Sequence, residues 1–326
     1  MACPFRCGCA KGFSTFGVRY SPESGCFNAK FTLQETFPSN PDIFSKVLKK
    51  GPFSLQAIKM QTVLTIAGYD PSSGAGVTAD LMVFAAHALF GTSCITNLTV
   101  QSTVGVLGTH PVAAETVRAT LDYLYADLPP KGIKIGMLGT APVVAAVADF
   151  LAQLRGQGNR IPVVLDPVLR SSSGRQLLDA NGVTLLRERL LPLVDWVTPN
   201  LDELGLLSGM PVSGRDDLPE AARVLQLGFA GLHVLATGGH LDPPDDYLLT
   251  GSGQGHWIEG ERIVTRSTHG TGCALSSALV SRLVLGDDVY SAVLAAKGYV
   301  AEAIRTAPPL GHGRGPVNHL WPLRRG

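Results

Sequence analysis

The chain has 326 residues, of which 45% are hydrophobic and only 16% are charged, so it can bury a large core. Its formal net charge is +1 and it contains no long basic run, which argues against a nucleic-acid surface and a polybasic membrane anchor. Its apolar segments are interrupted before they reach the roughly 20 residues that a membrane span needs. We therefore expect a globular cytoplasmic protein whose partners are small molecules.

The first 59 residues differ from the rest of the chain. They contain four of the six cysteines, Cys3, Cys7, Cys9 and Cys26, a distribution unlike a secreted disulfide framework. The stretch CPFRCGC lacks the second paired motif of a metal cluster. Residues 1–59 also lack sustained periodicity and the apolar core of a signal peptide, although their few acidic residues leave a transit peptide open. The leading interpretation is a disordered extension, with a start codon assigned too far upstream as an alternative.

From Met60 onward, apolar strands alternate with helical stretches. Strands are predicted over residues 62–68, 91–100, 132–138, 162–168, 195–200 and 231–239. Helices are predicted over residues 77–89, 113–128, 141–154, 180–191, 201–228 as a pair, 271–285 and 288–307. Short strands over 246–250, 255–260 and 262–266 are expected to form an antiparallel edge. This alternation is typical of a mostly parallel sheet covered on both faces, so residues 60–326 are predicted to form one α/β domain.

Polar residues and glycines follow these strands, at the edge where ligands gather in an open parallel sheet. The first strand is followed by Gly68, Asp70, Gly74, Gly76 and Asp80, the second by Gln101, and the third by Met137. The later strands are followed by Asp166 with a Ser/Gly loop, by Asn200 with Glu203, and by Gly238 with Gly239. Ordinary roles stay open for each of them, such as chain turns for the glycines and helix capping for Asn200.

The stretch STHGTGCALSSAL, residues 267–279, places glycines and a thiol at the start of an apolar helix. Backbone N–H groups at Gly270, Thr271 and Gly272, together with the positive end of the helix dipole, form a setting suited to an anion. A glycine-rich turn that only caps the helix is the alternative. Together with an acid for a metal and glycine loops, this helix start matches the needs of phosphoryl transfer.

From Met60 to Leu323 the chain resembles the hydroxymethylpyrimidine/phosphomethylpyrimidine kinases of thiamine biosynthesis, which belong to the ribokinase-like superfamily. The motifs that carry the resemblance are TIAGYDPSSGAGVTADL, KIGML, LDPV with SSSG, TPNLDE, TGGH, STHGTGCALSSAL and GHGRGPVNHLWPL. The resemblance implies a ribokinase-like three-layer α/β/α fold. It also implies ATP- and Mg²⁺-dependent phosphorylation of 4-amino-5-hydroxymethyl-2-methylpyrimidine, and then of the resulting monophosphate, at one site.

The resemblance also assigns roles to residues. It gives aminopyrimidine recognition to Gln101, whose amide supplies a donor and an acceptor, in a pocket lined by Gly68, Asp80, Met137 and Val168. Asp166 and Glu203 match the acids near the phosphates and the metal, which they would hold through water. Asn200, Thr237, Gly238 and Gly239 match nucleotide-binding positions. Gly270, Thr271 and Gly272 match the anion hole, and Cys273 matches the cysteine that replaces the catalytic aspartate of sugar kinases. The helix terminus is then expected to stabilise a Cys273 thiolate that takes the hydroxymethyl proton.

Two positions depart from the family pattern. Thr237 stands where the family often has lysine, and the loop RSSSG also lacks one, which leaves Arg170 as a candidate replacement. Two other functions stay open. One is a pyridoxal or pyridoxine kinase, against which Gln101 and Met137 argue. The other is a non-catalytic pyrimidine or nucleotide sensor, against which the acid pair and Cys273 argue. A homodimer is expected, because exposed sheet edges in this superfamily commonly pair.

Overall fold

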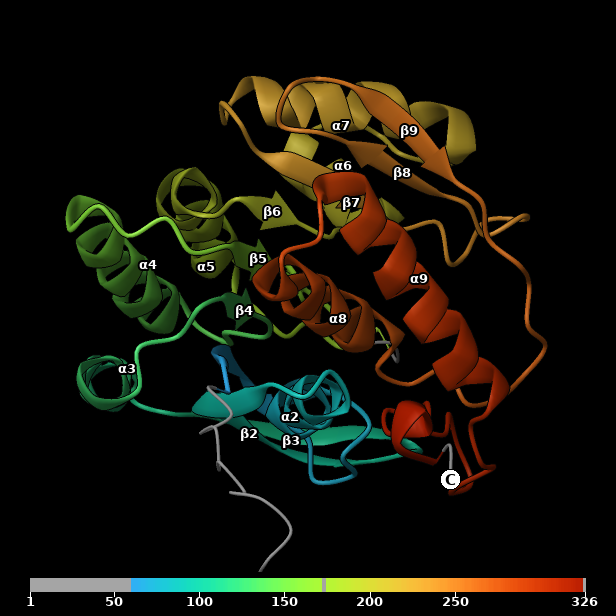
Figure 1. Cartoon of the computed structure of the whole chain (residues 1–326), viewed down its shortest axis with the longest axis horizontal. Helices are drawn as coiled ribbons and strands as arrows, with labels where there is room; N and C mark the ends of the chain where they lie inside the picture. The colour runs from blue at the N-terminus through green and yellow to red at the C-terminus, as the bar shows by residue number, and fades with distance from the viewer. Residues whose placement is uncertain (1–59, 172–173, 325–326) are drawn as a thin grey trace, which may run out of the picture. The chain divides into compact units, whose positions relative to one another are not determined.

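Strands and helices alternate along the chain from Thr62 to Arg305 (Figure 1). The computed structural model describes residues 60–171 and 174–324, all within one compact unit, Lys59–Gly326. Its strands are β1 (Thr62–Tyr69), β2 (Phe90–Ser102), β3 (Gly105–Pro111), β4 (Ile133–Ile135), β5 (Val163–Leu165), β6 (Trp196–Val197), β7 (His233–Ala236), β8 (Asp246–Leu249) and β9 (Gly255–Ile258).

The α-helices are α2 (Gly76–Ala86), α3 (Ala114–Asp127), α4 (Ala141–Gly156), α5 (Ala180–Leu185), α6 (Leu201–Ser208), α7 (Leu218–Leu227), α8 (Thr271–Leu285) and α9 (Val289–Arg305). Shorter helical segments are η1 (Leu186–Leu190), η2 (Leu191–Leu193), η3 (Arg215–Asp217) and η4 (Trp321–Arg324). The predicted helix over 180–191 thus continues beyond α5 as a π-helical turn, η1, followed by the 3-10 turn η2.

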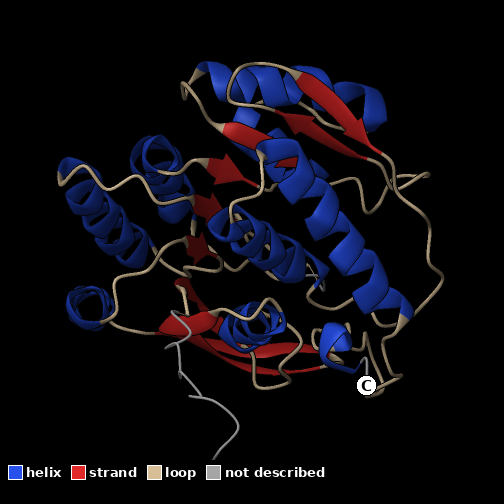
Figure 2. Ribbon diagram, viewed as in Figure 1, coloured by secondary structure: helices blue, strands red, loops and turns tan. Residues whose placement is uncertain are grey.

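The described strands form one nine-stranded sheet in the order β3-β2-β1-β4-β5-β6-β7-β8-β9 (Figure 2). Strands β2, β1, β4, β5, β6 and β7 run parallel to one another. Strand β3 pairs antiparallel with β2 at one edge, and β8 and β9 form an antiparallel extension at the other. The prediction of a mostly parallel sheet with an antiparallel edge is confirmed.

Helices cover both faces of this sheet (Figure 1). Helix α2 packs on β1 and on α8, while α8 packs on β4, β5 and α9, which places these three helices on one face. Helix α3 packs on β2 and α4, and α7 packs on β7, β8 and α6, on the other face. The three-layer α/β/α arrangement expected from the resemblance is therefore present.

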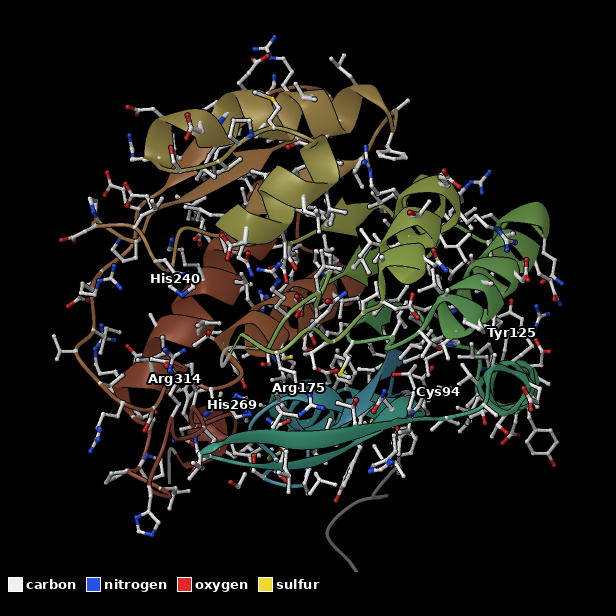
Figure 3. The ribbon with its side chains drawn as sticks, turned by 180° about the vertical axis from the view of Figure 1, so that it is seen from behind. Cys94, Tyr125, Arg175, His240, His269 and Arg314 are labelled. Atoms are coloured by element: carbon white, nitrogen blue, oxygen red, sulfur yellow. The ribbon has the colours of Figure 1, made fainter. Side chains whose placement is uncertain are left out.

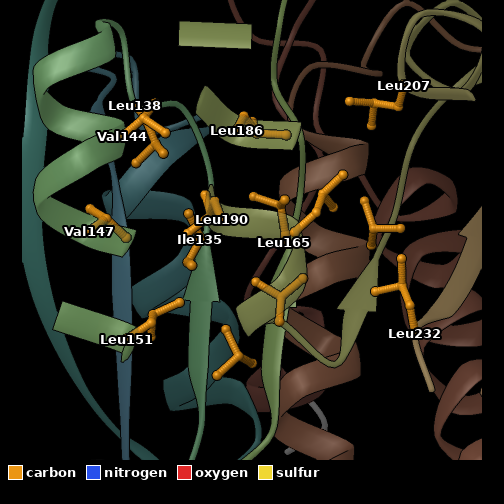
Figure 4. Packing of buried hydrophobic residues seen from close by; sticks show 14 of the residues in the cluster. Ile135, Leu138, Val144, Val147, Leu151, Leu165, Leu186, Leu190, Leu207 and Leu232 are labelled. Carbon is orange, nitrogen blue, oxygen red and sulfur yellow. The ribbon is translucent and has the colours of Figure 1, made fainter. Parts of the chain in front are cut away.

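Alternating strand residues belong to two separate hydrophobic clusters, because successive side chains of a strand point to opposite faces of the sheet. On β5, Val164 joins the cluster beneath α2, α8 and α9, whereas Val163 and Leu165 join the larger cluster on the opposite face. Figure 4 shows that larger cluster, in which Ile135 and Leu165 pack against residues of α4 and η1. The same alternation directs Lys134 of β4 away from the larger cluster.

Two details of the sheet differ from the sequence prediction. Strand β3 was not predicted, because GVLGTHP combines glycines and a proline with few β-branched residues. Residues 262–266, expected to be a third edge strand, form none, since the sheet ends at β9. The predicted extension over residues 1–59, including its four cysteines, lies outside the described residues. Among the described helices, none has the length and apolarity that crossing a membrane would require.

Candidate active site

The sequence-predicted residues gather at the carboxyl ends of neighbouring parallel strands. Gly68 is the last residue but one of β1, Met137 follows β4, Asp166 follows β5, Asn200 follows β6, and Thr237 follows β7. Backbone hydrogen bonds continue the ladder past the strand ends: the Asp166 N–H donates to Ile135 O at 2.8 Å, and the Thr237 N–H donates to Pro199 O at 2.8 Å. These strands are adjacent in the sheet, so the sheet order brings the residues to one edge.

Helix α8 begins at this edge without a side-chain cap. Gly270 occupies the N-cap position with a left-handed backbone, φ +85°, and no side chain accepts from its first turn. In contrast, α6 is capped by Asn200 and α9 by Asp288. Because the first N–H groups of a helix have no partner within it, those of Thr271, Gly272 and Cys273 are available to an anion.

Gly270 has no room for a side chain, because the Gly74 backbone lies against it. A side chain at residue 270 would overlap the Gly74 carbonyl oxygen, and a side chain at Gly74 would overlap the His269 ring. The glycine-rich loop after β1 and the loop before α8 are therefore in direct contact. Tight packing between these loops holds the start of α8 close to the end of β1.

Cys273 lies beside the carboxylate of Asp166 at the start of α8. Its thiol and the Ser276 hydroxyl both hydrogen-bond to Asp166. Burial raises the pKa of the Cys273 thiol to about 12, even though the Lys134 charge and the Gly76 N–H act in the opposite direction. The helix terminus alone predicts a thiolate, but burial outweighs it, so the thiol is the stable form near neutral pH.

Asp166 and Glu203 form a buried acidic pair. Burial raises the pKa of both groups, and the Asp166 charge adds to the effect at Glu203, whose pKa lies at about 8. Glu203 is held in place by the backbone N–H groups of Asn200, at 3.0 Å, and Leu169, at 3.4 Å. Two buried carboxyl groups, one of which raises the pKa of the other, form a site that a divalent cation would stabilise.

This acidic pair suits Mg²⁺ better than a metal that needs a full protein ligand set. Within the described residues, no group of three or more His, Cys, Asp or Glu side chains is arranged to hold a metal ion. Mg²⁺ is commonly held by one or two carboxylates, with water and substrate phosphates completing its coordination. Asp166 and Glu203 therefore fit Mg²⁺.

A buried ion pair lies beneath the site, between the sheet and helices α2 and α8. Lys134 Nζ donates to both carboxylate oxygens of Asp80, at 2.9 and 3.0 Å. Asp80 also accepts from Thr65 at 2.5 Å and from Ser277 at 2.7 Å. Sequence reasoning placed Asp80 on the wall of the pyrimidine pocket, but its side chain is fully buried and engaged with these partners. A lysine within an apolar strand was the signal that could have revealed the pair.

The predicted pyrimidine-binding residues lie around the ends of β1, β2 and β4. The Met137 sulfur would lie 3.1 Å from a Cβ at Gly68, so these two residues are close neighbours. The Gln101 amide lies 3.1 Å from Nε2 of His269, and that nitrogen lies 2.7 Å from the Asp70 carboxylate. Val168 follows β5 and is partly buried. His269, labelled in Figure 3, was not singled out from the sequence because its contacts come from distant segments.

The predicted nucleotide-binding residues lie at the ends of β6 and β7. Asn200 caps α6 and bridges to Thr237, while the Gly238 N–H donates to Asp246 at 2.8 Å. Gly239 has open space where a side chain would be. Sequence reasoning missed Arg262, which donates to the carbonyl oxygens of Gly239, at 3.0 Å, and Leu241. This arginine places a positive charge against the glycine loop after β7.

Comparison with known proteins agrees with this geometry. Residues 70–318 match the family model described as phosphomethylpyrimidine kinase. A hydroxymethylpyrimidine/phosphomethylpyrimidine kinase from Streptomyces coelicolor is 42% identical over 80% of this chain and 95% of its own length. A thiamine biosynthesis bifunctional protein from Geobacter sulfurreducens is 42% identical over 79% of this chain, which spans 52% of that longer protein.

Solved structures show the same likeness. The structure of a phosphomethylpyrimidine kinase from Clostridium difficile matches with a TM-score of 0.65 and 34% identity, covering 75% of this chain and 99% of that one. An ADP complex of Bacillus subtilis pyridoxal kinase matches with a TM-score of 0.71 and 32% identity, covering 80% of this chain and 97% of that one. Since the family model spans most of the chain and the matching kinases are similar over nearly their whole length, the chain belongs to the phosphomethylpyrimidine kinase family.

Proposed function

We propose that the chain transfers the γ-phosphoryl group of ATP to 4-amino-5-hydroxymethyl-2-methylpyrimidine, and then phosphorylates the monophosphate to the diphosphate, in thiamine biosynthesis. The observation that carries the proposal is the uncapped start of α8, where Cys273 and Asp166 lie side by side. Phosphoryl transfer relies mainly on positioning and on electrostatic stabilisation, and free backbone N–H groups beside an acidic pair supply both.

The acceptor is bound on the β1–β2 side of this helix start. Gln101 offers hydrogen-bonding groups to the aminopyrimidine ring, while Gly68, Met137 and Val168 lie at neighbouring strand ends. Gly68 has no side chain, so the ring can approach the backbone closely beside Met137. Asp80 acts from beneath the site, through Lys134, rather than by touching the ring.

The phosphates are bound on the other side, between α8 and the ends of β6 and β7. The N–H groups of Thr271, Gly272 and Cys273 hold the charge that develops on the transferred group. Asn200, Thr237, Gly238 and Gly239 bind the nucleotide, with Arg262 supplying positive charge. Mg²⁺, held by Asp166 and Glu203 through water, would neutralise phosphate charge when bound.

Cys273 receives the proton of the hydroxymethyl group in the first step. Only the thiolate can accept that proton, and burial keeps the pKa of this thiol high. In the second step the nucleophile is a phosphate oxygen, which is already anionic and does not need a base to remove a proton before it attacks. A neutral thiol then avoids the repulsion that a carboxylate at this position would exert.

A pyridoxal-type kinase is the second candidate, because a pyridoxal kinase is among the solved structures with the same fold. The discriminating experiment measures ADP release by the purified full chain with the hydroxymethylpyrimidine, its monophosphate and pyridoxal, each as sole acceptor. We expect the two pyrimidines to be preferred, and Gln101→Leu to weaken pyrimidine binding without weakening ATP binding. Preference for pyridoxal would support the second candidate. Pyrimidine binding without ADP release would support the sensor.

The proposed assembly is a homodimer formed through the β2–β3 edge of the sheet. Four large apolar side chains are exposed there: Leu98, Val100, Val104 and Leu107. No further strand lies beyond β3 within the described sheet, although Arg175 donates to the carbonyl oxygens of Val106 and Leu107. An edge with exposed apolar residues is suited to contact with another chain. The cytoplasmic location stays a prediction.

A further inference from the structure

The Gln101 amide has defined neighbours at both of its ends. One end lies 3.1 Å from His269 Nε2, and the other lies 3.2 Å from Thr99 Oγ1. His269 belongs to the loop before α8, whereas Thr99 precedes Gln101 by two residues on β2. Because an amide end is either a donor or an acceptor, its neighbours decide which orientation of the side chain is stable.

On the His269 side, the neighbour is a donor. His269 Nε2 lies 2.7 Å from a carboxylate oxygen of Asp70. Burial pushes the pKa of Asp70 upward, but hydrogen bonds from His269 and Ser72 outweigh it and hold the pKa below its ordinary value. A carboxylate can only accept, so Nε2 must carry the hydrogen that joins the pair. That nitrogen cannot also accept a hydrogen bond from an amide NH₂ group.

On the other side, the neighbour is an acceptor. Thr99 Oγ1 lies 2.9 Å from the carbonyl oxygen of Tyr69, which can only accept, so the hydroxyl hydrogen is directed to Tyr69. The hydroxyl oxygen is then free to accept from Gln101. The structure places the amide NH₂ toward His269 and its oxygen toward Thr99. A 180° turn of the amide would let its oxygen share the single Nε2 hydrogen of His269 with Asp70, and would let its NH₂ group donate to Thr99.

We infer that Asp70, His269 and Thr99 are positioning residues that fix the Gln101 amide with its oxygen toward His269 and its NH₂ group toward Thr99. The oxygen and the NH₂ group of the Gln101 amide can each form one further hydrogen bond. The oxygen can accept once more on the His269 side, and the NH₂ group can donate once more on the Thr99 side. Gln101 therefore presents an acceptor and a donor in a fixed order.

This order determines which ring is recognised, and the inference rests on the proposed function. A 4-aminopyrimidine presents a donor, its amino group, next to an acceptor, ring N3, which complements the fixed amide. A 4-oxopyrimidine presents the reverse: its C4 oxygen accepts and its N3–H donates. To bind it in the same pose, Gln101 would have to turn and lose both of its own contacts. Buried polar groups left unpaired make such rejection strong.

The test compares two substrates that differ only at this position: the 5-hydroxymethyl-2-methylpyrimidine with a 4-amino group and its 4-oxo analogue. The quantity measured is the ratio of their kcat/KM values in an ADP-release assay on the full chain. Thr99→Val removes the hydroxyl while keeping the side-chain shape, and His269→Met removes the ring donor. Thr99→Ser keeps the hydroxyl and is the matched control.

We expect the unaltered chain to prefer the 4-amino substrate by at least 100-fold. Thr99→Val and His269→Met should each reduce that preference at least tenfold, and Thr99→Ser should retain it. A purely structural role would lower both substrates alike and leave the ratio unchanged, which would overturn the inference while leaving the proposed function intact. Absence of activity on the 4-amino substrate in the unaltered chain would instead overturn the proposed function, and the inference with it.

Discussion

The Lys134 ammonium group lies 2.9 and 3.0 Å from the two carboxylate oxygens of Asp80, and neither side chain reaches solvent. Removing one partner of a buried ion pair leaves the other charge uncompensated, which typically costs about 3–5 kcal/mol. Lys134→Met should therefore lower the free energy of unfolding by about that amount, as measured by urea denaturation. Adding Asp80→Asn should restore part of it. Lys131→Met, at an exposed lysine nearby, should have almost no effect, and a similar loss in both lysine variants would contradict the prediction.

Glu203 should contribute a loss of stability as pH rises between about 4.5 and 8. Its pKa is raised from 4.5 to about 8, so in this window the folded chain holds a proton that the unfolded chain has released. The contribution is on the order of 4 kcal/mol across the window. Glu203→Gln should flatten this dependence in unfolding experiments at pH 6 and pH 8. Glu115→Gln, at an exposed carboxyl group on α3, should leave it unchanged. Equal pH dependence in the unaltered chain and Glu203→Gln would show that this carboxyl group is not the cause.

Substitutions at Cys273 should affect the two proposed phosphorylation steps differently. Cys273→Ala should slow the first step more than the second, because only the first removes a proton from a hydroxyl group. Cys273→Asp should retain appreciable activity on the free pyrimidine and lose disproportionately more on its monophosphate. The added repulsion is about 1 kcal/mol in water-like surroundings and about 4 kcal/mol at an effective dielectric near 20.

The measurement is the steady-state rate for each purified pyrimidine with each Cys273 variant. Because the pKa of the thiol is about 12, the first-step rate of the unaltered chain should also keep rising between pH 7 and 9. Parallel losses in both steps would leave Cys273 as a packing residue. Cys273→Ser controls for the size of the side chain.

Replacing Arg262 should weaken ATP binding. Its guanidinium group holds the carbonyl oxygens of Gly239 and Leu241, beside the proposed nucleotide site. Arg262→Gln should raise the KM for ATP by about tenfold, equivalent to roughly 1.4 kcal/mol, with a smaller change in kcat. Arg266→Gln, at an exposed arginine of the same loop, serves as the control. An unchanged KM in Arg262→Gln would leave Arg262 as a loop contact only.

The proposed homodimer should form through the β2–β3 edge of the sheet. Leu107 is 80% exposed on β3, so Leu107→Glu should convert the proposed dimer into a monomer by placing charge within an apolar interface. Light scattering after gel filtration reports the molar mass directly. Leu227→Glu changes an equally exposed leucine at the end of α7 and should leave the mass unchanged. A dimer that persists in Leu107→Glu would place the interface elsewhere.

The sequence was sufficient for features that depend on local patterns. The alternation of apolar strands and helices predicted the parallel sheet, and the glycines before α8 predicted an open helix start. Strand β3 was missed because its residues become a strand only through pairing with β2. Strand ends could be predicted to share one edge, but contacts between side chains could not.

The missed site residues show the same limit. His269 contacts Asp70 and Gln101 across long sequence separations, and Lys134 meets Asp80 only after β4 and α2 pack together. Asp80 was assigned to the pocket by resemblance, whereas its burial depends on that packing. The protonation of Cys273 likewise depends on how deeply the folded chain buries it, which a helix terminus in the sequence does not reveal.

The contact between Gly74 and Gly270 restricts how the sequences of two distant loops can change. A side chain at Gly270 would overlap the Gly74 carbonyl oxygen, which is backbone and present whatever residue occupies position 74. No second substitution at position 74 can therefore create the missing space. The acceptor side of the site can diversify through side chains such as Gln101 and Thr99, while the spacing between its two loops stays constant. New acceptor preferences in this fold should arise around an unaltered glycine contact.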